Sequence, residues 1–417
     1  MSRPRPSARS RWGVVVALPA VLACGDPTGP LDRLPRDLTP AERSVVTAAN
    51  AFGLDLFERL VADQPDENVF FSPLSAYLAL GMTANGAADA TLAEMRGILR
   101  QGGLTEDEAN EAYRGLLDLL LGLDSKVELS IANAIWHRLG LPVRPEFVDA
   151  SRSTFDATVD GVDFRDPATA QAINDWVSDR TRGRIDEIVN SPDDLANTVV
   201  FLVNAIFFKG TWQLQFDPDQ TRPESFELLD GSFAEVEMMR RKDIEILRHH
   251  AGETLEIAEL LYGRGAFTMT ILLPPRGVSP ASLLEGVSPG VWDGWIGRLE
   301  ETAVIDAVEM PKFRLEWEKK LNHDLSAMGM PLAFSGGADF SRIAPGGEGF
   351  FLSEVKQKAF VEVNEEGTTA AAATSVNVAD SAKPSFRVDR PFVFAIRERF
   401  SGTLLFLGQV VNPAEGG

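Results

Sequence analysis

The sequence of 417 residues contains a single cysteine, Cys24, and only four histidines. One cysteine excludes an internal disulfide and any cysteine-rich zinc site. The histidines are His137, His249, His250 and His323, and they show neither H-x-x-x-H nor H-E-x-x-H spacing. His249 and His250 are adjacent, so on a strand their side chains would face opposite ways. This scarcity of metal ligands and histidine bases disfavours an enzyme, and no metal or other cofactor is expected.

Positive charge is also scarce, with 40 Lys and Arg against 61 Asp and Glu and a net charge of −21. An acidic surface repels phosphate backbones, so nucleic acid is not expected as a partner. The chain lacks a long apolar run as well. The clearest one, Trp12 to Ala23, contains Gly13 and Pro19 and is too short to span a bilayer as a permanent helix.

The N-terminal residues instead have the pattern of a signal peptide, predicted over residues 1–23. Four arginines and no acidic residue precede the apolar run, which ends in Val21-Leu22-Ala23-Cys24. That tetrapeptide resembles a bacterial lipobox, in which the cysteine is lipidated and becomes the mature N-terminus. The alternative is a plain secretory signal cleaved near Ala23. Loss of the four arginines would change the net charge to −21 − 4 = −25. Residues 24–38, rich in glycine and proline, are predicted to be a flexible tether.

Residues 39–417 are predicted to form one domain with both helices and strands, without an internal repeat or linker. Thr39-Pro40-Ala41-Glu42 is a capping box with proline at the first helical position. The apolar residues that follow at helical spacing predict one packed face. They are Val45, Ala49, Phe52, Leu56 and Leu60.

Several segments have the pattern of strands. Val199–Phe208 is apolar except for Asn204 and is predicted to be buried on both faces. A buried Asn204 without hydrogen-bond partners would cost roughly 1–3 kcal/mol. The other predicted strands are Val127–Ile131, Phe267–Leu273, Val304–Val308, Lys358–Val363 and a C-terminal hairpin of Pro391–Ile396 and Thr403–Val411 across Arg397–Gly402.

The segment after Lys358–Val363 has an unusual composition. Four alanines, Ala370, Ala371, Ala372 and Ala373, are followed by a stretch to Lys383 that is small or polar except for Val376 and Val378. Such a stretch supplies little apolar burial and is expected to be exposed. As a strand, however, it would place only small or apolar groups and threonines on one face. Those residues are Thr368, Ala370, Ala372, Thr374 and Val376.

Five segments in order along the chain carry a further signal. They are Asn68–Ser75, Ile173–Val177, Phe201–Trp212, Phe360–Thr368 and Asp389–Phe394. Together they resemble the motifs of the serpin family, large serine-protease inhibitors that trap proteases by changing shape. The resemblance covers about residues 40–414 and identifies the chain as a secreted, bacterial lipoprotein-type member. It implies an α+β fold with three β-sheets, eight or nine helices and an exposed reactive-centre loop, here at about residues 365–385.

The family mechanism implied by this resemblance requires no catalytic residue of the inhibitor. A serine protease attacks the loop as a substrate and forms a covalent acyl-enzyme. The cleaved loop then inserts into the central sheet as a new strand and deforms the protease. The expected partner is thus a target serine protease, bound covalently by a monomeric inhibitor. A membrane is expected only through a lipid anchor at Cys24, at the cell envelope.

The resemblance assigns roles to particular residues. The hinge comprises Glu365, Glu366, Gly367, Thr368 and the four alanines. Ser72, Ser75 and Asn204 match a polar cluster, the shutter, that keeps the central strands closed. Gln357 stands where many members have a histidine, and its amide can still donate and accept hydrogen bonds. Trp212 matches the tryptophan at the top of the sheet, the breach, where simple core packing is the alternative role.

The reactive bond has two possible registers. Counting forward from Gly367 places it at Ser381-Ala382, and counting back from Pro391 places it at Asp380-Ser381. Ser381 would suit an elastase-like or subtilisin-like protease, whereas Asp380 would suit an aspartate-cutting one. Neither position is basic, which disfavours trypsin-like targets. The alternative function is that of a non-inhibitory serpin, a binding or chaperone-like protein, although the hinge here carries no bulky residue.

Overall fold

The computed structural model describes residues 29–195, 198–367 and 385–415, without the side chains of residues 194, 243–247 and 302–304. The chain separates into residues 1–30 and a compact unit of residues 31–417, to which all the elements below belong. The predicted signal peptide and Cys24 lie outside the described residues.

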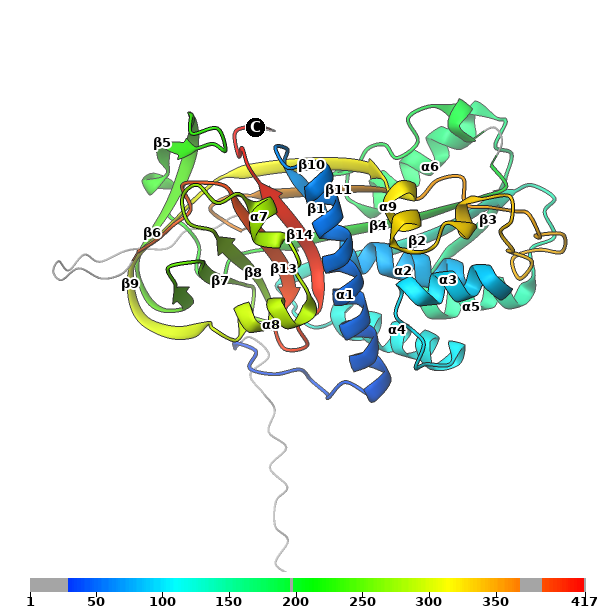
Figure 1. The fold of residues 1–417 in the computed structure, drawn as a ribbon, viewed down its shortest axis with the longest axis horizontal. Helices are drawn as coiled ribbons and strands as arrows, with labels where there is room; N and C mark the ends of the chain where they lie inside the picture. The colour runs from blue at the N-terminus through cyan, green and yellow to red at the C-terminus, as the bar shows by residue number, and fades with distance from the viewer. Residues whose placement is uncertain (1–28, 196–197, 368–384, 416–417) are drawn as a thin grey trace, which may run out of the picture. The chain divides into compact units, whose positions relative to one another are not determined.

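The first helix, α1 (Pro40–Asp63), begins at the predicted capping box. The backbone N–H of Thr39 donates to the Glu42 carboxylate at 2.8 Å, and that of Glu42 donates to the Thr39 hydroxyl at 3.1 Å. The predicted apolar face is fully buried and packs against β14 (Figure 1).

The described residues form eight further α-helices, which agrees with the predicted number of eight or nine in all. They are α2 (Pro73–Ala84), α3 (Asp89–Ile98), α4 (Glu106–Leu121), α5 (Pro145–Phe155), α6 (Pro167–Arg180), α7 (Pro280–Leu284), α8 (Pro289–Ile296) and α9 (Asn322–Met328). The strands are β1 (Val69–Phe71), β2 (Val127–Arg138), β3 (Thr158–Val162), β4 (Val200–Gly210), β5 (Arg222–Glu227), β6 (Phe233–Ala251), β7 (Glu256–Tyr262), β8 (Phe267–Leu273), β9 (Glu300–Pro311), β10 (Phe313–Lys320), β11 (Lys356–Val363), β12 (Ser385–Arg387), β13 (Phe392–Glu398) and β14 (Leu404–Val410).

These strands form three sheets, as expected. The largest has nine strands in the order β1-β14-β13-β8-β7-β6-β9-β12, with β5 paired to β6. The C-terminal hairpin is confirmed as β13 and β14, which pair antiparallel. The predicted turn was placed too early, because Arg397 and Glu398 belong to β13 and are buried. Arg397 tolerates burial because Glu259 of β7 accepts its guanidinium hydrogen bond.

The other two sheets are small and lie next to each other. One has the order β3-β2-β4, and the other consists of β10 and β11 (Figure 1). β4 alternates between buried and half-buried side chains, so the prediction that both of its faces are buried was only partly right. The buried face carries Phe201, Val203 and Ala205, which share a hydrophobic cluster with residues of α6.

The segment before α1 is bound to the body of this unit. The backbone N–H of Leu31 donates to the Arg264 carbonyl at 2.7 Å, and the Arg399 guanidinium donates to the Leu31 carbonyl at 2.9 Å. Leu31 and Leu34 pack against the core, and Leu38 is buried in it. No helix in the described part of the chain has the length and apolar character that a bilayer crossing requires.

Candidate functional site

The carboxyl ends of β4 and β11 meet at the predicted hinge. The backbone N–H of Trp212 donates to the Glu366 carbonyl at 2.9 Å, and that of Phe216 donates to the Glu365 carbonyl at 2.9 Å. The Trp212 indole N–H donates to the Asn364 carbonyl at 2.9 Å, and its ring stacks on Tyr262 at 4.3 Å. Trp212 therefore packs in the core and also binds the backbone that leads into the loop.

Gly367 ends this contact in a tight turn. Its backbone pairs with Asn364 in an isolated bridge, and its φ of +98° lies in the region that favours glycine. A Cβ atom here would lie 2.3 Å from the Trp212 nitrogen and 2.6 Å from the Gly210 carbonyl oxygen. The close approach of the hinge to the end of β4 therefore requires glycine.

Glu365 connects the hinge to two other segments. Its carboxylate accepts the Thr221 hydroxyl at 2.7 Å and lies 3.2 Å from the Lys312 ammonium. Burial raises the pKa of Glu365, but the hydrogen bonds from Thr221 and Lys312 outweigh this effect and leave the pKa below its ordinary value. The hinge thus holds an ionised carboxylate under partly buried conditions.

A chain of hydrogen bonds connects the beginning of β11 to the middle of β4. The Gln357 amide of β11 makes two bonds of 3.0 Å to the backbone of Ser72, as acceptor from its N–H and as donor to its carbonyl. The Ser72 hydroxyl donates to the Leu405 carbonyl at 2.6 Å and accepts the Ser75 N–H at 3.2 Å. The Ser75 hydroxyl then donates to Asn204 of β4. The four polar residues predicted as a cluster are therefore brought together.

The chain of bonds continues into a residue that the sequence did not single out. The Asn204 amide donates to the Asn133 side chain at 2.6 Å, and Asn133 donates to the Phe155 carbonyl at 2.8 Å. Asn133 lies directly opposite Asn204 in the pairing of β2 with β4 and is 1% exposed. Asn133 follows the predicted strand Val127–Ile131 by two positions, and it lies in a strand only because β2 continues to Arg138. Asn204 is half-buried, and its hydrogen-bond partners are Ser75 and Asn133.

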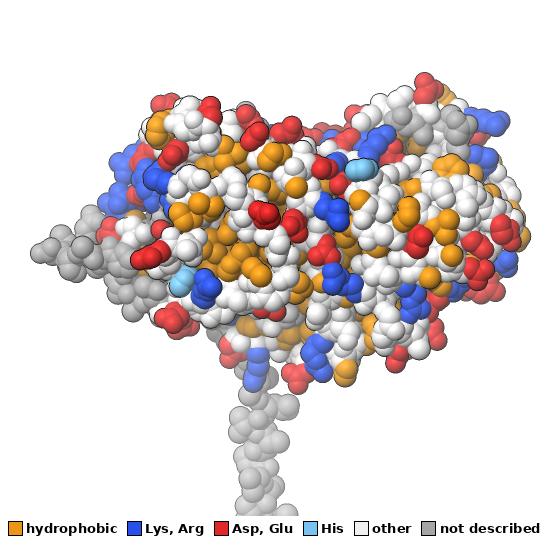
Figure 2. Space-filling view, in the orientation of Figure 1, with side chains coloured by type: hydrophobic (Ala, Val, Ile, Leu, Met, Phe, Trp, Pro, Cys, Tyr) orange, Lys and Arg blue, Asp and Glu red, His pale blue; other side chains and the backbone are white. Residues whose placement is uncertain are grey.

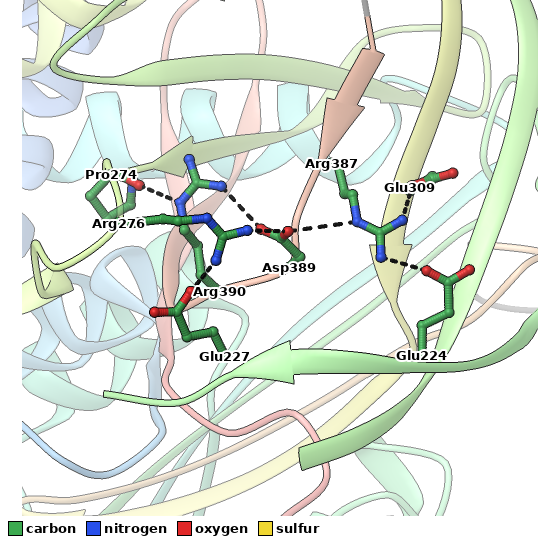
Figure 3. A network of polar contacts seen from close by, with 8 residues as sticks. All are labelled: Glu224, Glu227, Pro274, Arg276, Glu309, Arg387, Asp389 and Arg390. Carbon is green, nitrogen blue, oxygen red and sulfur yellow. Dashed lines mark hydrogen bonds and ion pairs between the residues drawn. The ribbon is translucent and has the colours of Figure 1, made fainter. Parts of the chain in front are cut away.

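At the other end of the predicted loop, β12 is held by one short parallel pairing and a set of ion pairs. Its three residues pair with β9. Figure 3 shows Arg387 between Glu309 and Glu224, with 2.5 Å to Glu224. Arg387 also lies 3.6 Å from Asp389.

Asp389 connects this group to the adjoining strands. It lies 2.5 Å from Arg276 and 3.0 Å from Arg390, whose guanidinium also donates to the Pro274 carbonyl at 2.8 Å (Figure 3). Arg276 pairs in addition with Glu227. The residues directly after the predicted loop are therefore fixed to β5, β9 and the end of β8.

The reactive bond itself lies outside the described residues. This applies to Thr368, Ala370, Ala371, Ala372 and Ala373 of the hinge and to Asp380, Ser381 and Ala382. Among the residues that the structure does describe, no group of His, Cys, Asp and Glu side chains could hold a metal ion. His249 is buried against Phe386, and burial lowers the pKa of its imidazole.

The two strands that flank the polar cluster have free edges facing each other. β4 pairs only with β2, and β11 pairs only with β10, so among the described residues no ladder joins β4 to β11. Both strands run from the polar cluster toward the contact of Trp212 with Glu366, so they point the same way. A third strand running opposite to both could hydrogen-bond with each of these edges.

Comparison with known proteins agrees with the fold and this arrangement. The chain matches the family of serpins, serine protease inhibitors, over residues 47–413. Iripin-3 of Ixodes ricinus is 35% identical over 377 residues, which cover 88% of this chain and 94% of Iripin-3. The chain therefore belongs to the serpin family, which is described as serine protease inhibitors.

Two solved structures show the same fold. Native protease nexin-1 with heparin superposes with a TM-score of 0.81 at 28% identity and covers 89% of this chain and 100% of its own. Thyroxine-binding globulin in complex with thyroxine gives a TM-score of 0.79 at 29% identity, covering 89% of this chain and 99% of its own. The serpin fold expected from the sequence is thus confirmed.

Proposed function

We propose that this protein is an irreversible suicide-substrate inhibitor of serine proteases. A target protease cleaves the reactive loop, which follows Gly367 in the chain. The protease is trapped as its acyl-enzyme while the loop inserts between β4 and β11. The observation that carries this proposal is the pair of free, co-directional edges of β4 and β11 with the hinge at their common carboxyl end. A loop that turns back at Gly367 runs antiparallel to both strands, as a shared ladder requires.

The proposed roles of the polar residues follow from their bonds. Gln357, Ser72, Ser75 and Asn204 form the shutter that keeps the two edges together before cleavage. Trp212 forms the breach beside the hinge residues Glu365 and Glu366, where the loop would enter first. Each contact holds the uninserted state and can be exchanged for a contact with the inserted strand.

The proposed targets have a small specificity pocket, as in elastase-like or subtilisin-like proteases. This follows from Ser381 in the register counted from Gly367, with Asp380 as the alternative. A denaturing gel of the purified protein with pancreatic elastase, subtilisin and an aspartate-specific protease tests both points. We expect a stable high-mass band and a released peptide that begins at Ala382.

The same gel separates the remaining possibilities. A peptide beginning at Ser381 would move the reactive bond to Asp380-Ser381 and change the target class. Complete cleavage without a covalent band from any protease would contradict the inhibitor proposal. It would favour a non-inhibitory binding protein, an alternative supported by the similarity to thyroxine-binding globulin, which was solved with thyroxine bound.

We also infer that the inhibitor is secreted and lipid-anchored through Cys24 at the cell envelope. The family includes many secreted extracellular proteins, and the lipobox-like Val21-Leu22-Ala23-Cys24 supports the anchor. Stable anchoring would need more than one acyl chain. Mass spectrometry of the native N-terminus should find a lipidated Cys24, whereas an unmodified N-terminus near residue 24 would contradict the anchor.

A further inference from the structure

A cavity lies between strands β6, β7 and β9 of the large sheet and the segment that follows Trp212. It provides about 120 Å³ that the centre of a water molecule can occupy, many times the roughly 10–15 Å³ needed by one water. Its walls come from residues 213–216, β6, β7, β9 and Arg399. No part of it belongs to the hinge, the shutter or the reactive loop.

The lining combines an apolar part with three arginines. Phe216 and Val308 are buried, Leu260 and Leu261 are half-buried, and Leu214 is exposed. The arginines are Arg241, Arg248 and Arg399. In a protein with a net charge of −21, and with acidic side chains spread over the face seen in Figure 2, this local concentration of positive charge is unusual.

The carboxylate inside the cavity is already fully engaged. The Glu259 side chain is entirely buried, and one of its oxygens accepts Arg248 at 2.5 Å. The other oxygen accepts Arg397, which lies behind the wall. Glu301 also lines the cavity, but it is exposed, and it makes no ion pair with an arginine among the described side chains.

Two of the arginines are therefore left without a carboxylate partner. Arg241 donates to the Gln215 carbonyl, and Arg399 donates to the Leu31 carbonyl at 2.9 Å. The Nε–H group of each is buried and, within the described structure, has no hydrogen-bond acceptor. Buried donors without acceptors are costly, and a ligand oxygen would satisfy them.

The pKa shifts of Arg241 and Arg399 have the direction expected for buried guanidinium groups. Burial lowers the pKa of Arg241, and the nearby Asp217 only partly offsets the effect. Burial also lowers the pKa of Arg399, with Glu259 acting in the opposite direction. A guanidinium still stays protonated at neutral pH, so the cavity holds positive charge that its own carboxylates do not balance.

We propose that this cavity binds a small organic monocarboxylate with an apolar body, such as an aryl acetate. The carboxylate would accept the free N–H groups of Arg241 and Arg399, and the apolar body would pack on Phe216, Leu260 and Val308. Guanidinium groups are well suited to carboxylates because two of their N–H groups point in parallel. The cavity is too small for a macromolecular segment with its own backbone.

Binding would also reach the hinge, an effect that rests on the proposed function. Residues 213–216 line the cavity, and the N–H group of Phe216 holds the Glu365 carbonyl. A ligand packed on Phe216 stabilises the uninserted state, because it binds the native arrangement of this segment. Loop insertion should then be slower, and a larger share of the inhibitor should be cleaved without trapping the protease.

Titration calorimetry with indole-3-acetate, and with the neutral indole-3-acetamide as the matched probe, tests the binding itself. We expect a Kd on the order of 0.1 mM for the acid and binding at least roughly tenfold weaker for the amide. Arg241→Gln should weaken the binding of the acid about tenfold, and Arg241→Lys should recover part of the loss. Arg165→Gln, which removes an exposed charge outside the cavity, is the control and should change nothing.

Equal affinity for acid and amide would overturn the proposal, as would no binding of the acid at all. An equal loss in Arg165→Gln and Arg241→Gln would do the same. If Arg241→Gln does not fold, the binding proposal is still tested by comparing the acid with the amide and by the affinity of Arg241→Lys for the acid.

The effect of the ligand on the hinge is tested separately. The ratio of covalent complex to cleaved inhibitor is measured with and without saturating indole-3-acetate. A protein that binds the acid but traps no protease would reject the inhibitor function and leave the cavity proposal intact.

Discussion

Glu365 holds the hinge in place both through its charged carboxylate and through its backbone carbonyl. It binds Thr221 and Lys312 while its backbone carbonyl accepts the Phe216 N–H. A carboxylate in this position stabilises the uninserted hinge only while it is ionised. Its neighbours therefore make the hinge sensitive to acid.

The first prediction concerns the pH dependence of this contact. The pKa of Glu365 in the folded protein lies below its ordinary value of 4.5. Its contribution to stability is therefore present above that pH and is lost as the pH falls through the lower native pKa. We expect Glu365→Gln to lower the thermal midpoint at about pH 6, with the difference from wild type shrinking as the pH falls below 4.5.

Thr221→Val serves as the control for this measurement, because it removes one donor and leaves the carboxylate. It should reduce the pH-dependent difference without abolishing it. A constant difference between wild type and Glu365→Gln across the whole pH range would show that ionisation plays no part.

A second prediction at this scale concerns Thr368, the first residue expected to face inward on insertion. Thr368→Arg would require a charge to be buried as the loop enters, at a cost of several kcal/mol. We expect the variant to be cleaved as a substrate, with little covalent complex on a denaturing gel. Thr368→Ser is the matched control and should inhibit like wild type. An unchanged complex-to-cleavage ratio for Thr368→Arg would contradict insertion at this position.

The contacts of a single residue could be predicted where its side chain needs hydrogen-bond partners in an apolar segment. An asparagine in an apolar strand needs partners, and Asn204 has them. The buried pair of Arg397 with Glu259 was not predictable, because 138 positions separate the two residues in sequence. For the same reason Arg397 was assigned to a turn, which is the ordinary place for an arginine whose partner is unknown.

Among the elements, helix α2 has the most direct part in holding the two small sheets together. Its N-cap, Ser72, bonds to β11 and β14, and Ser75 in its first turn bonds to β4. The helix terminus therefore carries out two tasks, since the hydroxyl that caps it also belongs to the chain of bonds between the strands.

Ser72→Ala should weaken this connection. It removes the cap of α2 and leaves the buried Leu405 carbonyl without its hydroxyl donor, a loss of roughly 1–3 kcal/mol. We expect lower thermal and denaturant midpoints. Ser44→Ala, which removes an exposed hydroxyl bonded to the Pro40 carbonyl, should change the midpoints little. Equal effects of the two substitutions would rule out a special role for the cap.

A further prediction concerns strand β12, which follows the loop and holds its C-terminal end. It has only three paired residues, so the ion pairs of Arg387 are a large part of what holds it. Arg387→Met should let β12 detach and the intact loop insert, inactivating the protein without cleavage. Partly exposed pairs contribute about 1 kcal/mol, so we expect inactivation on warming to be roughly two- to tenfold faster.

The matched control is Arg222→Met on β5, an exposed arginine that pairs with Glu224 at 3.2 Å but does not bond to β12. Residual inhibitory activity after heating, measured together with size-exclusion chromatography, distinguishes inactivation from aggregation. Identical decay of the two variants would show that the contacts of Arg387 do not control release.

Local patterns located one helix and seven of the fourteen strands described. The capping box located α1, and apolar runs ending at prolines located β8 and β9. The long strand β6 was missed, because its apolar residues alternate with arginines, lysines and glutamates whose partners lie on β9 and β7. Hydrophobic periodicity therefore identifies elements that bury one regular apolar face. It misses strands whose charged side chains are paired with residues far away in the sequence.

For the whole molecule, the central feature is a layer that is divided into two small sheets. Insertion of one strand would join β3-β2-β4 to β11-β10 and add ladders on both sides of the new strand. The native state is then kinetically held rather than the most stable arrangement.

Cleavage in the loop should therefore raise thermal stability. We expect the thermal midpoint of the cleaved protein to exceed that of the intact protein by at least roughly 10 °C. Differential scanning calorimetry before and after cleavage by a protease that is not trapped provides the measurement. Thr368→Arg, cleaved in the same way, should gain less, and a cleaved wild-type protein with an unchanged midpoint would show that the loop stays outside.

This division of the layer could not be predicted from composition or periodicity, which identify strands but not their neighbours. The ordered motifs implied three sheets and a central sheet that accepts the loop, but not that this sheet is divided. The cavity beside residues 213–216 lies beyond both kinds of prediction, because its walls come from segments that are far apart in the sequence.

No ladder joins β4 to β11 in the described structure, and each molecule has one loop proposed to insert between them. If insertion is the trap, every molecule acts once and is consumed together with one protease. Protection would then depend on the number of molecules made and on their replacement rate, and not on turnover. A cell relying on such a protein would be defended up to a fixed quantity of attacking protease, beyond which the excess remains fully active.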